Sequence, residues 1–179
     1  MGYHGFLEQA EAGGYVVVTP LGYIRRGWYG SRTTDDPQDN IYSEQDVMEV
    51  IQLVRDEFSI DNNRIYLWGH SMGGAGTYHI AAKNPDMFAG LGVAAPAPER
   101  SVDIEGSLNK IKHVPIFVLQ GDEDSLVTLT REWVATMEEL GMQHVYAEIA
   151  GGDHSLVISQ NSEHMQKFVD FFNIVRKKY

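Results

Sequence analysis

The sequence predicts an α/β fold, with a mostly parallel sheet and helices on both of its faces. Two observations carry this prediction: short, nearly continuous apolar runs that are typical of buried parallel strands, and apolar residues at helical spacing between them, so that strands and helices alternate along the chain. The chain has 179 residues, of which 43% are apolar and 22% charged, and shows no linker or internal repeat. We therefore expect one domain over residues 1–179.

Five apolar runs are predicted to be strands, each bounded by turn-forming residues. In chain order they are Tyr15–Val18, Ile65–Trp68, Phe88–Val93, Pro115–Leu119 and Val145–Ile149. The first of them is β-branched and stopped by Pro20 and Gly22, which favours a buried strand.

Helices are predicted where apolar residues recur at helical spacing, at about 43–58, 73–83, 133–140 and 165–175. Ser43, with Asp46 three residues later, has the pattern of an N-cap for the first of these helices. Between the strands and helices, Leu21–Asn40 is predicted to be a long loop, and Val102–His113 a loop with at most one helical turn.

Composition excludes several classes of function. The chain carries 25 acidic and 14 basic residues, a formal charge of −11, which argues against nucleic acid or an anionic membrane as a partner. The absence of cysteine excludes disulfides, thiolate catalysis and cysteine zinc sites. The apolar run near the start is too short for a signal peptide or a membrane span, so the sequence leaves the compartment open between the cytoplasm and a secreted multidomain enzyme.

Gly69-His70-Ser71-Met72-Gly73 is a G-x-S-x-G motif that follows a predicted strand and opens a predicted helix. In this context the serine is strained and exposed at the carboxyl end of the sheet, beside the positive end of a helix. We expect both glycines to be required because a Cβ at either position would collide with neighbouring backbone. The motif predicts Ser71 as a nucleophile, with Gly74 and Gly76 giving the helix room to approach.

A serine nucleophile needs a base and an acid, and in this context they follow it in the order acid, then histidine. His154 comes after the fifth predicted strand and a glycine pair, so we predict that it is the base. The acid lies in the loop after the fourth strand, where the spacing leaves Asp122 and Asp124 open. Asp153 is disfavoured because adjacent side chains on an extended loop point apart.

The segments Gly69–Gly73, Gly121–Val127 and Gly151–Ser155 together resemble the α/β-hydrolase superfamily. The likeness runs from about Gly13 to the C-terminus. In that superfamily the acid is commonly the aspartate of an Asp-x-x-Val segment, which implies Asp124. The segment from Tyr15 to Tyr29 is similar to the esterase branch, which includes enzymes that resemble polyhydroxybutyrate depolymerases, feruloyl esterases and acetylxylan esterases.

The resemblance implies a serine carboxylic-ester hydrolase that forms an acyl-enzyme and needs no metal or organic cofactor. The backbone N–H of Met72 is expected to be one oxyanion donor. Members of the superfamily take the second donor from a His-Gly loop that follows an earlier strand. Here Tyr3-His4-Gly5-Phe6 contains a His-Gly pair with no strand before it. We interpret it as the lead-in to a helix through Phe6, Leu7 and Ala10, with the oxyanion loop as the less favoured alternative, so the source of the second donor stays open.

The resemblance also implies a missing strand between Tyr15–Val18 and Ile65–Trp68, because members have further strands before Gly13. Either these two strands pair directly, or a second copy fills the gap by strand or domain swapping, or the chain is the C-terminal part of a longer hydrolase. The first two alternatives avoid buried, unpaired backbone groups.

Trp28 and Tyr29, in the long loop, and His70, inside the motif, are candidate substrate-binding residues. Aromatic rings in a loop beside the site could stack on an aryl or sugar-like group, although burial of Trp28 in the core is an equal alternative. His70 could instead only shape the turn. Two other functions stay open: a serine peptidase of the same fold, and an inactive, self-associating fragment without a complete oxyanion hole.

Overall fold

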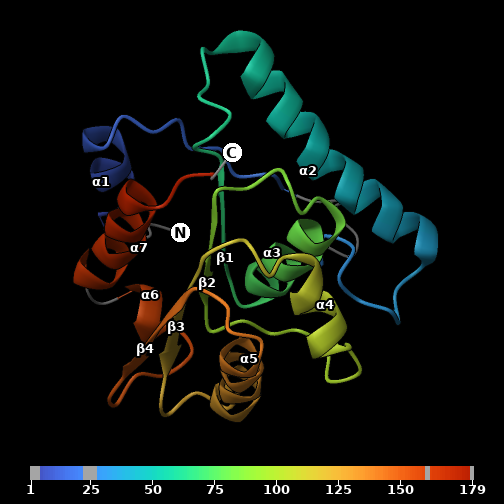
Figure 1. Cartoon of the computed structure of the whole chain (residues 1–179), viewed down its shortest axis with the longest axis vertical. Helices are drawn as coiled ribbons and strands as arrows, with labels where there is room; N and C mark the ends of the chain where they lie inside the picture. The colour runs from blue at the N-terminus through green and yellow to red at the C-terminus, as the bar shows by residue number, and fades with distance from the viewer. Residues whose placement is uncertain (1–4, 22–27, 160–161, 178–179) are drawn as a thin grey trace.

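The computed structural model describes residues 5–21, 28–159 and 162–177. Its centre is a four-stranded parallel sheet in the order β1-β2-β3-β4 (Figure 1). The strands are β1 Tyr66–His70, β2 Gly90–Ala94, β3 Ile116–Gly121 and β4 His144–Ile149. The helices are α1 Phe6–Ala12, α2 Pro37–Glu57, α3 Met72–Lys83, α4 Ile104–Lys110, α5 Val127–Glu139, α6 Leu156–Ser159 and α7 Ser162–Ile174.

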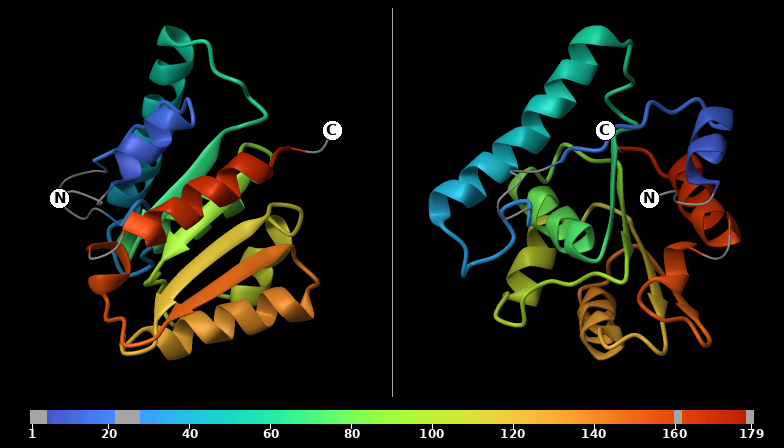
Figure 2. Two further views of the ribbon diagram at one scale, coloured as in Figure 1. Left: turned by 90° about the vertical axis from the view of Figure 1, so that its left-hand side faces the viewer. Right: turned by 180° about the vertical axis from the view of Figure 1, so that it is seen from behind.

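Helices cover both faces of the sheet, which confirms the predicted α/β class (Figures 1 and 2). Successive strand residues point to opposite faces, so each strand contributes to two apolar clusters. On β3, Ile116 and Val118 join the cluster under α3, α4 and α5, whereas Phe117 and Leu119 join the cluster under α7. Both clusters exclude water, and their burial stabilises the stacked layers.

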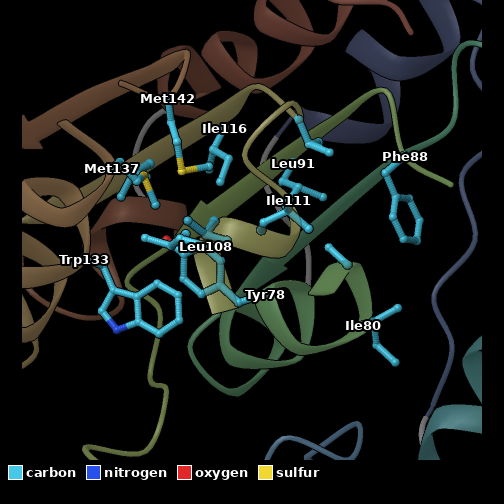
Figure 3. Packing of buried hydrophobic residues seen from close by; sticks show 14 of the residues in the cluster. Tyr78, Ile80, Phe88, Leu91, Leu108, Ile111, Ile116, Trp133, Met137 and Met142 are labelled. Carbon is cyan, nitrogen blue, oxygen red and sulfur yellow. The ribbon is translucent and has the colours of Figure 1, made fainter. Parts of the chain in front are cut away.

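The cluster under α3, α4 and α5 is built around a pair of aromatic rings (Figure 3). Tyr78 on α3 stacks on Trp133 on α5 with ring centroids 4.2 Å apart. Leu108 on α4 is fully buried beside them, in the region where the sequence predicted a loop with one helical turn.

Aromatic residues also pack on the opposite face of the sheet. The helix on that face, α7, confirms the predicted helix near the C-terminus. Phe168 on α7 packs edge-on against Phe117 of β3 at 4.7 Å and against Trp68 of β1 at 5.6 Å. Phe6 of α1 stacks on the same Trp68 at 5.2 Å, which holds α1 beside α7.

The prediction of a buried strand at Tyr15–Val18 is wrong. The segment has no strand partner among the described residues, and Val16, Val17 and Val18 are 46%, 37% and 42% exposed. The ring of Tyr15 instead packs against Tyr66 and lies under the Arg64 guanidinium. Strand propensity is realised only where a segment lies against the edge of another strand. Tyr15–Val18 does not pair with the outer edge of β1, and within the described residues that edge pairs with no strand. The described sheet therefore has four strands, not five.

The predicted N-cap at Ser43 is also wrong. Helix α2 begins at Pro37, and the carboxylate of Asp36 accepts a hydrogen bond from the Gln38 backbone N–H at 2.8 Å. Proline at the first helical position and an acidic N-cap stabilise a helix start. Ser43 lies inside the helix and is buried, so the long loop ends at Asp36 rather than Asn40.

Candidate active site

Ser71 lies in a strained turn between β1 and α3. Its φ of 55° and ψ of −117° are unusual for a residue with a side chain. Three backbone hydrogen bonds hold this geometry: the Ser71 N–H donates to Ala94 O at 2.9 Å, and the Ser71 carbonyl accepts from Ala75 at 3.1 Å and Ala97 at 3.0 Å. The turn is therefore fixed by the end of β2 as well as by its own helix.

Only one of the two motif glycines is required by space. A Cβ on Gly69 would lie 2.1 Å from the Gly73 carbonyl oxygen, whereas a Cβ on Gly73 would meet nothing within 4 Å. The expectation that a Cβ at position 73 would collide is therefore wrong. The later glycines also allow close approach: a Cβ on Gly74 would meet Pro96 at 2.9 Å and the Gly69 carbonyl oxygen of β1 at 3.4 Å, whereas one on Gly76 would meet Tyr29 of the long loop at 2.8 Å.

The structure brings Ser71, His154 and Asp124 together. The distance from His154 Nε2 to Ser71 Oγ is 2.8 Å, and that from His154 Nδ1 to Asp124 Oδ2 is also 2.8 Å. The Asp124 side chain is 1% exposed and the His154 side chain 38% exposed. A histidine bonded in this way can take a proton from a hydroxyl at one ring nitrogen while a carboxylate fixes its tautomer at the other.

Of the two aspartates that the spacing left open, only Asp124 contacts His154. Asp122 Oδ1 accepts from the Gly151 backbone N–H at 2.7 Å, so it links the loop of Asp124 to the turn before His154. These two loops lie so close together that a Cβ on Gly121 would be 2.1 Å from Gly152 O, so only glycine fits at this position. Asp153 points elsewhere and accepts from the Ser155 N–H at 2.8 Å.

The electrostatics of the site favour an ionised acid. Burial raises the pKa of Asp124, but hydrogen bonds from the Leu126 N–H, from His154 and from the Gln120 amide outweigh burial and hold that pKa below its ordinary value. The carboxylate is therefore charged at neutral pH and can stabilise an imidazolium on His154.

His70 contacts the backbone of His154 rather than its ring nitrogens. Its Nε2 lies 2.8 Å from the His154 carbonyl oxygen, which makes Nε2 the donor, and the two rings are 4.8 Å apart. Burial lowers the pKa of His70, partly offset by the bond to that carbonyl, so His70 is neutral at physiological pH. The contact links the turn at Ser71 to the loop of the base, and a role in substrate binding remains a prediction.

The candidate substrate loop is fastened beside the turn at Ser71. Tyr29 packs against the helical Gly76, and its hydroxyl donates to Pro20 O at 3.3 Å. The Arg32 guanidinium lies 4.7 Å from the centre of the Trp28 ring. Thus Tyr29, not Trp28, anchors the loop to the core cluster, while stacking of either ring on a substrate stays a prediction.

Glu99 joins this loop to the segment that contacts Ser71. Its Oε2 accepts from the backbone N–H of Thr33 at 2.9 Å and from the Thr33 hydroxyl at 2.6 Å. These bonds lower the pKa of Glu99, with smaller help from Thr34 and Arg32. Because Ala97, two residues earlier, donates to the Ser71 carbonyl, the same short segment holds both the loop and the turn at Ser71.

The first predicted oxyanion donor is suitably placed in the chain. Met72 opens α3 directly after Ser71, and its N–H donates to no acceptor among the residues that the structure describes. Of the His-Gly pair, His4 lies outside the described residues, and Gly5 is the N-cap of α1 with φ 73°, which agrees with a helix lead-in. Within the described ranges no group of three His, Asp or Glu residues could hold a metal ion. Nor is any described helix long and apolar enough to cross a membrane.

Sequence reasoning missed Gln120 and Thr130, which lie behind Asp124. Gln120 is completely buried, Thr130 is 1% exposed, and the Gln120 amide nitrogen lies 3.0 Å from Asp124 Oδ2. The available signal was a polar residue that directly continues the apolar run Pro115–Leu119, at a position whose alternation points it into the core.

Comparison with known proteins supports the fold and the family. The chain is 31% identical over 118 residues to the bifunctional acetylxylan esterase/xylanase XynS20E of Neocallimastix patriciarum, a match of 66% of this chain and 16% of that protein. It is 44% identical over 48 residues to the S-formylglutathione hydrolase of Bos taurus, covering 27% and 17% of the two chains. The chain thus matches under a fifth of the length of these two curated relatives.

Solved structures show the same architecture. A thermostable esterase superposes with a TM-score of 0.61 at 26% identity, over 75% of this chain and 37% of that one. Arabidopsis thaliana SOBER1 superposes with a TM-score of 0.64 over 94% and 89% of the chains, and at 16% identity it shows the fold alone. The family model described as "Putative esterase" matches residues 9–168. The chain therefore belongs to this esterase family of the α/β-hydrolase superfamily.

Proposed function

We propose that this chain is a serine carboxylic-ester hydrolase in which Ser71 is the nucleophile, His154 the base and Asp124 the acid. The observation that carries the proposal is the pair of 2.8 Å contacts on opposite nitrogens of one imidazole. Membership of the esterase family supports the reaction class. In this assignment Asp122 and Asp153 have structural roles in their loops.

The geometry supports an acyl-enzyme route. Ser71 Oγ adds to the ester carbonyl while His154 Nε2 takes the hydroxyl proton, and the Met72 N–H donates to the oxygen that becomes negative. The alcohol then leaves with the proton from His154. Water, deprotonated by the same nitrogen, attacks the acyl-Ser71 ester. The bond to Ser71 Oγ then breaks, His154 returns the proton to that oxygen, and the acid is released. Throughout, the Asp124 carboxylate stabilises the imidazolium.

We propose esters with a small acyl group as substrates. The names of two relatives carry an acetyl and a formyl group, in acetylxylan esterase and S-formylglutathione hydrolase. On the other side of the scissile bond, Trp28 and Tyr29 are the proposed contacts for the alcohol part, because Tyr29 packs against α3 close to the nucleophile. The acidic surface disfavours polyanionic substrates.

Replacing Ser71 tests the proposal. We expect Ser71→Ala to lower p-nitrophenyl acetate turnover by a factor on the order of 10⁴ or more and to abolish labelling by a fluorophosphonate probe, because both need the hydroxyl. The matched control is Ser101→Ala, an exposed serine before α4, which should behave as wild type. Undiminished turnover by Ser71→Ala would reject the assignment.

Two alternatives are separated by substrate and by labelling. A peptidase of the same fold would cleave matched peptide amides as well as esters, so ester-only turnover rejects it. An inactive scaffold would fold, as judged by circular dichroism, yet take no probe. A missing second oxyanion donor would lower turnover by about 10²–10³ without abolishing labelling.

We also propose that a second copy of the chain is a partner, through strand exchange at the outer edge of β1. The chain carries both an edge without a strand among the described residues and a β-branched segment, Val16–Val18, that is exposed and outside the sheet. Reciprocal exchange would pair both, as in domain swapping. Light scattering should give the mass of a dimer that Val17→Lys reduces to a monomer. A monomer at high concentration would reject this partner.

A further inference from the structure

Gln120 occupies a position where an apolar residue would be expected. It extends the face of β3 that carries Ile116 and Val118, and it is 0% exposed beneath α5. Burying an amide is unfavourable unless its polar atoms find partners. The Gln120 side chain therefore needs hydrogen bonds, and where they go shows what it does.

Its partners join the triad acid to a helix. The amide nitrogen donates to Asp124 Oδ2 at 3.0 Å and to the Gly121 carbonyl at 3.2 Å, and the amide oxygen accepts from the Thr130 hydroxyl at 2.8 Å. The direction of this chain is determined, because an ionised carboxylate only accepts. The Gln120 nitrogen must face Asp124, so its oxygen must face Thr130, whose hydroxyl must then donate.

Gln120 donates to the same Asp124 oxygen that contacts His154. Asp124 Oδ2 receives both the Gln120 amide and His154 Nδ1, whereas Oδ1 receives the Leu126 N–H at 3.0 Å. The Leu126 bond alone leaves the carboxylate able to turn about its side-chain axis. A second donor on Oδ2 fixes the plane of the carboxylate, and thereby the direction in which it faces the imidazole.

We propose that Gln120 and Thr130 are positioning residues for the reaction: Thr130 on α5 holds the Gln120 amide in one orientation, and the amide holds Asp124 Oδ2 against His154 Nδ1. This inference rests on the proposed function, because it takes Asp124 as the acid. It predicts that the chain of hydrogen bonds from Thr130 to Ser71 transmits a change at α5 to the nucleophile. Neither Gln120 nor Thr130 touches a substrate in this scheme.

Thr130 allows the cleanest test because it has an isosteric variant and a conservative one. Thr130→Val removes the hydroxyl but keeps the shape, and Thr130→Ser keeps the hydroxyl. We expect Thr130→Val and Gln120→Met each to lower kcat about tenfold with KM unchanged, because small misplacements of a catalytic group reduce turnover steeply. Thr130→Ser should retain most of the wild-type kcat. Thr128→Val, at an exposed threonine of α5, is the matched control for the substitution itself.

Proton NMR detects the contact between Asp124 and His154 without any measurement of turnover. The His154 Nδ1 proton, identified by its loss in His154→Ala, should resonate far downfield in the wild type. It should shift or broaden in Thr130→Val and Gln120→Met, and return in Thr130→Ser. Wild-type kcat and an unchanged resonance in both Thr130→Val and Gln120→Met would overturn the inference, and Gln120 would then have only a packing role in the core.

The failure of this inference is distinguishable from that of the proposed function. If Ser71→Ala retains turnover, the nucleophile is wrong, whatever Thr130 does. If the wild type shows no turnover, the NMR resonance still decides whether Gln120 and Thr130 orient the Asp124–His154 pair. A fall in kcat that Thr130→Ser does not restore would also count against the inference.

Discussion

Gly69 and Gly73 flank Ser71 symmetrically in the sequence but have different surroundings. The α-carbon of Gly69 faces the backbone of the first turn of α3, so even a methyl group would overlap the Gly73 carbonyl at 2.1 Å. Gly73 has open space where its side chain would be. The motif therefore needs its first glycine for the turn itself, and the structure gives no steric reason for the second.

Alanine substitutions at the two glycines should separate these roles. We expect Gly69→Ala to lower the free energy of unfolding by about 1–3 kcal/mol, as overpacking does, and to displace Ser71. Gly73→Ala should leave stability unchanged or raise it by up to about 1 kcal/mol, since alanine favours a helix. Urea denaturation of both variants measures the difference. Equal destabilisation would contradict this account of the turn.

The lowered pKa of Asp124 also makes a prediction about stability in acid. A carboxyl whose pKa is lower in the folded state stabilises the fold above its unfolded pKa of about 3.9, and that stabilisation is lost as pH falls through the folded pKa. The gap in unfolding free energy between wild type and Asp124→Asn should therefore narrow as pH falls from about 5 toward 2. Denaturant titrations over this range measure the gap; a gap that widens in acid would contradict the lowered pKa.

At the scale of elements, helix α2 shows how a local signal is realised. Its N-cap is Asp36, and Pro37 follows directly. Ser43 has the same kind of capping pattern in the sequence, but it lies more than one turn inside the helix. A side chain caps only where the chain enters the helix from an extended conformation, and Asp36 has a φ of −59° and a ψ of 127°. Glu44 joins α2 to α3: its carboxylate accepts a hydrogen bond from Lys83 at 2.7 Å and lies 2.7 Å from His79 Nε2.

Alanine at each capping candidate distinguishes the two helix starts. We expect Asp36→Ala to lower the free energy of unfolding by about 1 kcal/mol, because the Gln38 N–H loses its acceptor. Ser43→Ala should leave the start of α2 in place. Thermal and urea unfolding give the stabilities, and amide exchange at residues 37–40 reports fraying. Fraying in Ser43→Ala alone would contradict the observed helix start.

Sequence reasoning recovered the elements whose signals are local and missed those that depend on partners. The four strands of the sheet were found because each is a short apolar run between turns. The motif and the chain order predicted Ser71 and His154, which lie 2.8 Å apart in the structure, whereas they left Asp122 and Asp124 open and only the resemblance to the superfamily indicated Asp124. Tyr15–Val18 has strand propensity, but pairing depends on a distant edge that no local pattern describes. Gln120 was missed for the same reason: its proposed role depends on hydrogen bonds with Thr130 and Asp124, which only the fold brings to it.

At the scale of the whole molecule, protection from water decreases from the middle of the sheet to its edges. Strands β2 and β3 are buried along their whole length and paired on both sides, whereas β1 and β4 are edge strands in the described sheet and are only partly buried. Local opening follows such gradients, because segments with few buried contacts open at a lower free energy than the core.

Hydrogen exchange should reproduce this order. We expect amides of Gly90–Ala94 and Ile116–Gly121 to exchange most slowly, those of the edge strands faster, and those of Val16–Val18 fastest, since these make no backbone hydrogen bond within the described residues. Mass spectrometry of peptic fragments gives the order at low protein concentration. Protection of Val16–Val18 that increases with concentration would be the signature of strand exchange, and slow exchange there in a monomer would contradict the exposed segment.

The close approach of Gly121 to Gly152 has a mechanical consequence. It holds the loops that carry Asp124 and His154 together, with the hydrogen bond from the Gly151 N–H to Asp122 as a second link. The turn at Ser71 is held by the end of β2, and it joins the loop of His154 through the hydrogen bond from His70 to the His154 carbonyl. The position of the His154 imidazole relative to the Asp124 carboxylate is thus set by contacts between their own two loops, whereas its position relative to Ser71 depends on the contact with His70. The His70 hydrogen bond therefore links the turn at Ser71 to the two loops that carry His154 and Asp124.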